Sequence, residues 1–163
     1  MEEIQQKLVE AKECLRRADH MASVTFSLLN ETKLLLVIVD NLYQAIGKSI
    51  EALLRYDYLY KRIGEIPLGE RARLQFFKDN VARRYNIPYE SMTAIKELYD
   101  LMEKRKKSPM EFVRKDTYII ASNEYKLRLL DIKKVKEYVE KTKMFIKKVE
   151  SVIEIRDRRS NHF

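Results

Sequence analysis

The sequence predicts an all-α protein: a single-domain helical bundle built on long antiparallel helices, with shorter helices in the middle of the chain. Three observations support this fold class. Apolar residues recur every three or four positions over long stretches, which is the spacing of one helix face. Glycine and proline number only three each in 163 residues, so few turns are available. The chain is 45% hydrophobic, and its length suits one domain with a substantial core.

Two long helices are predicted in the first 63 residues. The stripe of the first helix is Ile4, Leu8, Ala11, Leu15, Ala18, Ala22, Thr25 and Leu29. The second helix begins at about Glu31, and its stripe is Leu35, Ile38, Leu42, Ala45, Ser49, Ala52, Tyr56, Leu59 and Ile63. Further apolar residues widen this second face, so we expect the helix at the centre of the bundle. Asn30 is a candidate N-cap that would separate the two into a hairpin; one bent helix through residue 30 is the alternative.

Two shorter helices are expected next. Gly64, Pro67 and Gly69 form the clearest break in the chain. A helix should then run from about residue 69 to 85, with Leu74, Phe77 and Val81 facing inward. The next should run from residue 89 to about 106, with Met92, Ile95, Leu98, Tyr99 and Met102 on its apolar side.

A short fifth helix is predicted after residue 107. Ser108 would be its N-cap, Pro109 its first residue and Glu111 the partner in a capping box. No segment alternates with period two for long enough to predict a strand, and "SNEYKLRLLD" is expected to be an irregular connection.

The last helix has a clear beginning and a clear seam. Asp131 is its expected N-cap, and Ile132, Val139, Ile146 and Ile153 recur every seven residues. Lysines fill the outer positions. We expect one domain over residues 1–155 and a flexible C-terminal tail over residues 156–163.

Composition predicts a cytoplasmic protein without a membrane segment. The most apolar run, Leu34 to Val39, is too short to cross a bilayer, and the acidic, polar N-terminus does not resemble a signal peptide. A single cysteine, Cys14, builds no disulfide framework. Lys, Glu and Arg greatly outnumber the ten Asn and Gln residues, a bias typical of thermophiles.

The residues that could carry chemistry are few. With two histidines and one cysteine, we expect no metal site and no cofactor. No nucleophile elbow and no glycine-rich phosphate loop occur. Among the acidic residues, Asp40, Asp57 and Asp116 stand out because they fall on apolar faces.

Basic residues cluster in the second half of the chain. The net charge is +8, yet residues 1–40 carry five basic and seven acidic residues. Residues 71–115 carry twelve basic and six acidic residues. The nucleic-acid-binding candidates are Arg83, Arg84, Lys104, Arg105, Lys106, Lys107, Arg114 and Lys115. Arg71, Arg73, Lys78 and the tyrosines Tyr85, Tyr89, Tyr99 and Tyr118 are interleaved with them, and phenol rings stack on bases. The structural interpretation is a solvated surface whose cations follow helix C-termini.

The N-terminal run "AKECLRRADHMASVTFSLLNETKLLLVIVDNLYQAIGKSIEALLRYDYLYKRI" resembles the first two helices of archaeal HEPN-like proteins (higher eukaryotes and prokaryotes nucleotide-binding). The matching words are Asn41-Leu42-Tyr43 with Ala45, then Ala52-Leu53-Leu54. "EFVRKDTYII" and "VKEYVEKTKMFIKKVES" resemble the later helices. The resemblance implies a helical bundle that forms a homodimer. It also implies a binding partner, which would be either RNA or a protein such as a toxin–antitoxin or nucleotidyltransferase partner.

Active HEPN proteins resemble metal-independent ribonucleases with an Arg followed by a His near the start of a late helix. Arg114 lies about where that Arg would be, but no His occurs between residues 21 and 161. We therefore expect a degenerate, non-catalytic member that dimerises and binds a partner. The alternative is a diverged ribonuclease or toxin-type protein that uses Arg114, Lys115, Asp116 or Tyr118 in place of the Arg and His pair.

Overall fold

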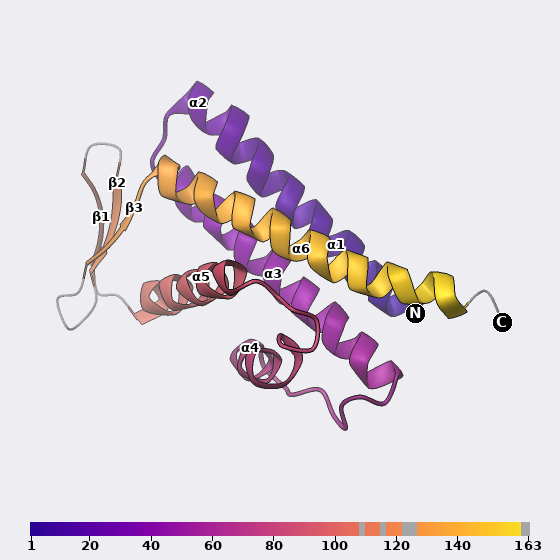
Figure 1. The fold of residues 1–163 in the computed structure, drawn as a ribbon. Helices are drawn as coiled ribbons and strands as arrows, with labels where there is room; N and C mark the ends of the chain where they lie inside the picture. Colours follow the sequence, from indigo (N-terminus) through magenta and orange to yellow (C-terminus); the bar gives the residue numbers. More distant parts are fainter. Residues whose placement is uncertain (108–109, 115–116, 122–126, 161–163) are drawn as a thin grey trace.

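The structure, a computed structural model, describes residues 1–107, 110–114, 117–121 and 127–160. Within these residues the protein is an all-α bundle of five helices with a small sheet at one end (Figure 1). The long helices α1 (Glu2–His20), α3 (Leu34–Leu59) and α6 (Ile132–Ser160) pack together, and the middle helices are shorter. The predicted fold class is confirmed.

The first helix carries the predicted stripe only as far as Ala22. α1 continues through a π-helical turn, η1 (Met21–Thr25), into α2 (Phe26–Leu29). A π turn holds an additional residue, so the face that follows it is shifted by one position. Phe26 is buried there in place of Thr25, while Leu29 is 58% exposed.

Asn30 is not an N-cap, contrary to the prediction. It lies just after α2 with a left-handed backbone (φ 50°, ψ 34°) and donates its N–H to the carbonyl of Phe26 at 2.7 Å. Asn tolerates this conformation better than most residues, which suits it to a helix C-terminus. α3 then begins at Leu34, three residues later than predicted, and the two helices form the expected hairpin.

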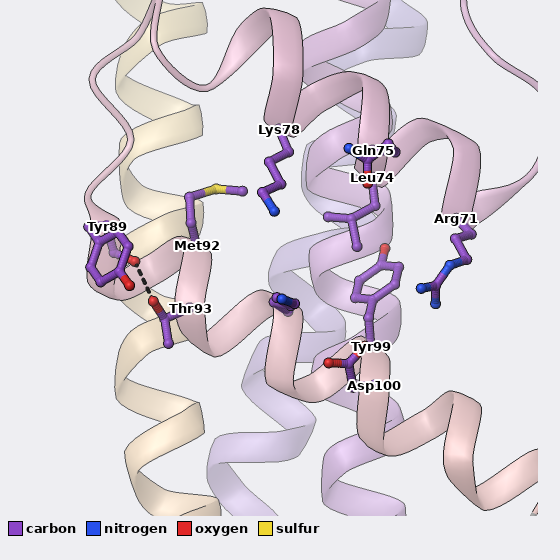
Figure 2. A pocket seen from close by; sticks show the side chains of 10 residues that line it. Arg71, Leu74, Gln75, Lys78, Tyr89, Met92, Thr93, Tyr99 and Asp100 are labelled. Atoms are coloured by element: carbon purple, nitrogen blue, oxygen red, sulfur yellow. Dashed lines mark hydrogen bonds between the residues drawn. The ribbon is translucent and has the colours of Figure 1, made fainter.

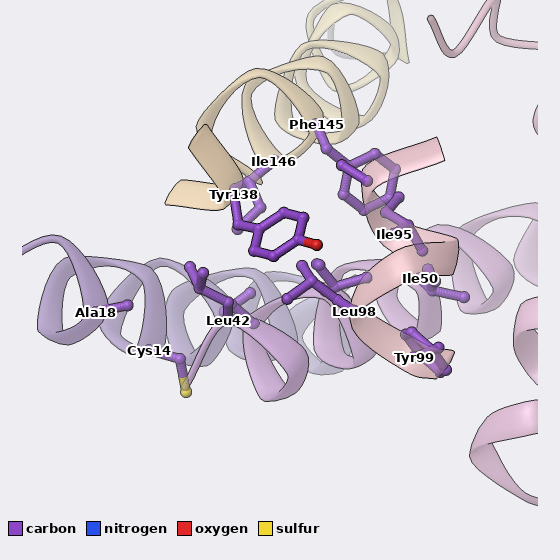
Figure 3. Packing of buried hydrophobic residues seen from close by; sticks show 14 of the residues in the cluster. Cys14, Ala18, Leu42, Ile50, Ile95, Leu98, Tyr99, Tyr138, Phe145 and Ile146 are labelled. Atoms are coloured by element: carbon purple, nitrogen blue, oxygen red, sulfur yellow. The ribbon is translucent and has the colours of Figure 1, made fainter. Parts of the chain in front are cut away.

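Helix α3 is the central helix, as predicted. It contacts α1, α4, α5 and α6, and its buried residues lie on more than one face. Figure 3 shows how Leu42 and Ile50 of α3 meet side chains of the other helices, among them Leu98 and Phe145. A broad apolar face on α3 therefore explains why the bundle is built around it.

Of the two short middle helices, the second follows its predicted bounds closely, whereas the first, predicted to reach Tyr85, ends at Val81. α4 (Glu70–Phe76) continues as the π-helical turn η2 (Phe77–Val81), and turns lead on to Asn86. Asn86 has a φ of 52°, and Ile87 N–H bonds to the carbonyl of Ala82 at 3.0 Å. A left-handed residue followed by a backbone bond to the carbonyl five residues earlier is the Schellman motif, which ends a helix. α5 (Tyr89–Lys107) begins shortly afterwards.

The predicted helix after residue 107 is wrong. Three strands form an antiparallel sheet there: β1 (Met110–Arg114), β2 (Thr117–Ala121) and β3 (Leu127–Leu130). The register pairs Phe112 with Ile119, and β3 lies in the segment predicted as an irregular connection. Val113, Thr117, Tyr118, Ile119 and Ile120 are β-branched or aromatic, and this preference for a pleated surface outweighs the capping signal. Ser108 and Pro109 lie outside the described residues.

The last helix begins where the sequence predicts. The Asp131 carboxylate accepts the Lys134 N–H at 2.8 Å, which confirms the N-cap. Val139, Ile146 and Ile153 are buried along the predicted seam. α6 continues to Ser160 and so enters the predicted tail; the flexibility of that tail stays a prediction. In the described part of the chain, the helices are too short or too polar to cross a membrane.

Candidate functional site

The best-defined candidate is a basic pocket between α4–η2 and α5, with a volume of about 320 Å³ (Figure 2). One wall comes from α4 and η2 and consists of Arg71, Leu74, Gln75 and Lys78. The other wall comes from α5 and consists of Tyr89, Met92, Thr93, Lys96, Tyr99 and Asp100. Both helices turn their apolar sides toward the bundle, so the polar side chains beside those faces meet across the pocket.

The charge of the basic pocket is mainly positive. Three cations, Arg71, Lys78 and Lys96, face one carboxylate, Asp100. Arg71 is ion-paired with Glu103 of α5, which links the two walls. Lys78 and Lys96 are exposed and form no ion pair with any described residue. The two lysines therefore remain available to an anionic ligand.

Tyr99 forms part of the pocket floor. It is 5% exposed, and its ring centroid lies 4.7 Å from that of Tyr43 on α3. Tyr43 in turn donates its hydroxyl to Glu70 at the start of α4. Burial, followed by the neighbouring Tyr43 and Glu70, raises the pKa of the Tyr99 phenol. Tyr99 is therefore a neutral ring at physiological pH and no candidate base.

Tyr89 lies at the open end of the pocket. The residue is 84% exposed, whereas tyrosines are on average of intermediate burial. The Thr93 hydroxyl donates to the Tyr89 backbone carbonyl at 3.0 Å and leaves the phenol ring itself unengaged (Figure 2). An exposed ring beside two available lysines can stack on a planar ligand.

A second cluster lies around Asp57, near the end of α3. It includes Arg84 and Tyr85, two of the residues from the predicted cluster of basic and tyrosine residues. The Asp57 carboxylate is fully buried. It accepts Arg84 Nη1 at 2.5 Å, Arg62 Nη1 at 3.1 Å, and the hydroxyl of Tyr85. Burial and the Asp57 carboxylate raise the pKa of Tyr85 to about 12. Arg84 and Tyr85 therefore have partners within the fold, whereas the neighbouring Arg83 is exposed.

The other predicted nucleic-acid-binding residues lie elsewhere. Lys104, Arg105 and Lys106 belong to the last turns of α5, where Lys106 is exposed and the other two are partly buried. The Lys107 backbone ends α5, and its side chain is outside the described part of the structure. None of these four residues lines the basic pocket.

Arg114 is the last residue of β1 and does not open a helix, which corrects the expectation for it. Lys115 and Asp116 lie outside the described residues. The third carboxylate singled out in the sequence, Asp40, accepts the side-chain amide of Gln44 one turn later in α3. No chemistry is therefore assigned to these positions.

The pocket was partly visible in the sequence. Arg71, Lys78, Tyr89 and Tyr99 belong to the predicted cluster of basic and tyrosine residues, and the structure brings these four together. Lys96 and Asp100 were missed as site residues. Their only signal was a charged pair four residues apart beside the apolar face of α5. The described residues hold no group of three or more His, Cys, Asp or Glu that could bind a metal ion.

Comparison with known proteins gives no further identification. The chain matches no family model, no curated protein and no solved structure. A function for this protein is therefore inferred from its fold and from the side chains of the basic pocket.

Proposed function

We propose that this protein binds single-stranded RNA through the basic pocket and does not cleave it. The observation that carries the proposal is the lining of the pocket. Lys78 and Lys96, which have no ion-pair partner among the described residues, line it together with the exposed ring of Tyr89. Proteins that bind single strands without sequence preference combine a positive groove with aromatic stacking platforms. The resemblance to HEPN-like proteins supports the same class of ligand.

The spacing of the pocket residues favours a chain of phosphates over a single phosphate. Arg71 and Lys78 are seven residues apart, about 10 Å along their helix, and Tyr89 and Asp100 span about 16 Å along α5. A compact phosphate needs cations that converge on one point, whereas Arg71 and Lys78 lie about two helical turns apart. A strand lying along the pocket would pass Lys78 and Lys96 and reach Tyr89 with a base.

The alternative of a diverged ribonuclease has less support. It would need Arg114 at the start of a late helix, near a proton-transferring group, and Arg114 ends a strand. Incubation of labelled RNA with the wild type and with Arg114→Ala and Lys115→Ala tests this alternative. Cleavage by the wild type that both substitutions abolish would favour the enzyme over the binding protein.

Salt-dependent binding of a labelled, unstructured RNA oligonucleotide tests the proposal. Each phosphate contact on a single strand contributes a slope of about −0.7 to the plot of log K against log salt. The two pocket lysines that have no ion-pair partner among the described residues then predict a slope of about −1.4, or a loss of affinity of roughly sevenfold between about 50 and 200 mM salt. Fluorescence anisotropy measures this directly.

The double variant Lys78→Gln/Lys96→Gln should remove both contacts, so its affinity should change little over the same salt range. Its matched control is Lys136→Gln/Lys147→Gln, which removes two exposed lysines of α6 outside the pocket. If both variants change the slope equally, the binding is a general effect of net charge and the pocket is not the site. The predicted homodimer is tested separately, by sedimentation with and without RNA.

A further inference from the structure

Asp57 joins the two ends of one segment of the chain. The segment connects α3 to α5. Arg62, near its start, bonds to this carboxylate at 3.1 Å, and Arg84, near its end, bonds to it at 2.5 Å. Tyr85 donates its hydroxyl to the same group. A single buried carboxylate therefore bonds to both ends of the segment of residues 62–85. We call this group of four side chains, Asp57, Arg62, Arg84 and Tyr85, the clasp.

The backbone at both ends supports this closure. Lys61 has a left-handed backbone with a φ of 56°, and Arg62 N–H bonds to the Asp57 carbonyl at 2.8 Å. This Schellman ending turns the chain back so that the Arg62 side chain reaches the Asp57 carboxylate. The left-handed Asn86 makes the equivalent turn at the other end, directly after Tyr85.

The closed segment supplies one whole wall of the basic pocket. Arg71 and Lys78 lie within it, whereas Lys96 and Tyr89 belong to α5. α4 contains no fully buried residue, and its side chains Leu74 and Phe76 are only partly buried against the core. Its position depends on these two side chains, on the ion pair between Arg71 and Glu103 of α5, and on the contacts at its ends. These are Tyr43 with Glu70 at the start, and the apolar η2 residues and the clasp at the far end.

We propose that Asp57 is the positioning residue of the basic pocket, holding the wall of α4 and η2 at the distance from α5 at which both walls contact one RNA strand. The proposal rests on the proposed function for its ligand. It assigns a task to a buried carboxylate that touches no ligand itself. Where Asp57 is removed, the wall occupies several positions, and only the fraction of molecules with the wall in place binds at full affinity.

Distance measurements between spin labels test the positioning directly. Labels are attached at Ala72→Cys on α4 and Lys136→Cys on α6, two exposed sites outside the pocket. The natural Cys14 is buried and does not interfere. The wild type should give one narrow distance distribution. Asp57→Asn, which keeps the shape of the side chain and removes its charge, should give a broader one.

Two further variants make the test specific. Tyr85→Phe removes one hydroxyl donor from the clasp, leaves every charge in place, and should broaden the distribution to a smaller extent. Asp19→Asn is the matched control, because Asp19 is ion-paired with Lys143 at 3.1 Å across α1 and α6, away from the clasp. The control should give the wild-type distribution and the wild-type RNA affinity.

RNA affinity is measured on the same labelled proteins. If the wall is in place in about a tenth of the Asp57→Asn molecules, the affinity falls about tenfold, and saturating RNA narrows the distribution again. Distributions unchanged by Asp57→Asn and Tyr85→Phe overturn the proposal, as do broadened ones in a protein with wild-type affinity. If the wild type binds no RNA, the proposed function and the binding half of this proposal both fall. The distance data then still decide whether Asp57 holds the wall.

Discussion

Replacing Asp57 by Ala should strongly destabilise the protein. The substitution removes the only acceptor described for Arg62 Nη1 apart from the Tyr85 hydroxyl. The Arg62 side chain is only 17% exposed, so its charge would remain largely buried without a counter-ion. Such a charge is costly because the low-dielectric interior does not replace the water it has lost.

The magnitude follows from the partners of the carboxylate. Removing one member of a buried ion pair costs about 3–5 kcal/mol. The Arg84 side chain is 36% exposed and can turn into solvent, which argues for the lower half of that range. Tyr85 loses a bond to a charged acceptor, which is worth about 1.5–3 kcal/mol when it is intact. These terms overlap, so we expect a total loss of about 3–4 kcal/mol.

Urea unfolding followed by circular dichroism measures this free energy of unfolding. The control Asp19→Ala breaks a half-exposed pair and should cost no more than about 1 kcal/mol. Tyr85→Phe should destabilise the wild type more than it destabilises Asp57→Ala, because the acceptor is already absent in the latter. A loss below about 1 kcal/mol for Asp57→Ala would refute the reasoning, since it would mean that the buried arginine needs no counter-charge.

Three other substitutions test the fold and its pH dependence. Phe145→Ala should lower the free energy of unfolding by about 3–5 kcal/mol. The ring of Phe145 is fully buried and packs edge-on against Phe77, with 5.8 Å between the ring centroids. Phe145→Leu should cost less in the same urea titration. Asp131→Ala should cost about 1 kcal/mol through the lost N-cap of α6, while Asp131→Ser should retain most of the stability. Tyr85 predicts an alkaline loss of stability: its pKa is raised to about 12 in the folded protein, against about 10 unfolded. The unfolded state then binds fewer protons between these values, so the free energy of unfolding falls as the pH rises from about 10 to 12. Tyr85→Phe should make that decline shallower, and an unchanged slope would contradict the assignment.

Most of the helical architecture was readable from local patterns. The seams of α3, α5 and α6 follow from residues that recur every three or four positions, and the N-cap at Asp131 was predicted from its side chain. Helices are formed by contacts between residues close in sequence, and their buried faces repeat with a fixed period. Such features are therefore present in the sequence itself.

Two local signals were misleading because the same residues also favour another backbone conformation, and the structure adopts that one. Asn30 has a side chain that suits an N-cap and a backbone that tolerates a left-handed helix end, and the structure uses the second property. The capping pattern around Glu111 competed with a run of β-branched and aromatic residues, and pairing between strands favoured the sheet. Only the partner strand shows which preference prevails.

The candidate site depended almost entirely on tertiary structure. The sequence placed Arg71, Lys78, Tyr89 and Tyr99 in one basic region, but not on facing walls. It marked Asp57 as unusual among apolar residues, but named neither Arg84 nor Tyr85 as its partner. Those groups are 27 and 28 residues away from Asp57 along the chain. Helical period determines which face each residue occupies, whereas the packing of α4 and η2 against α3 and α5 decides which faces meet.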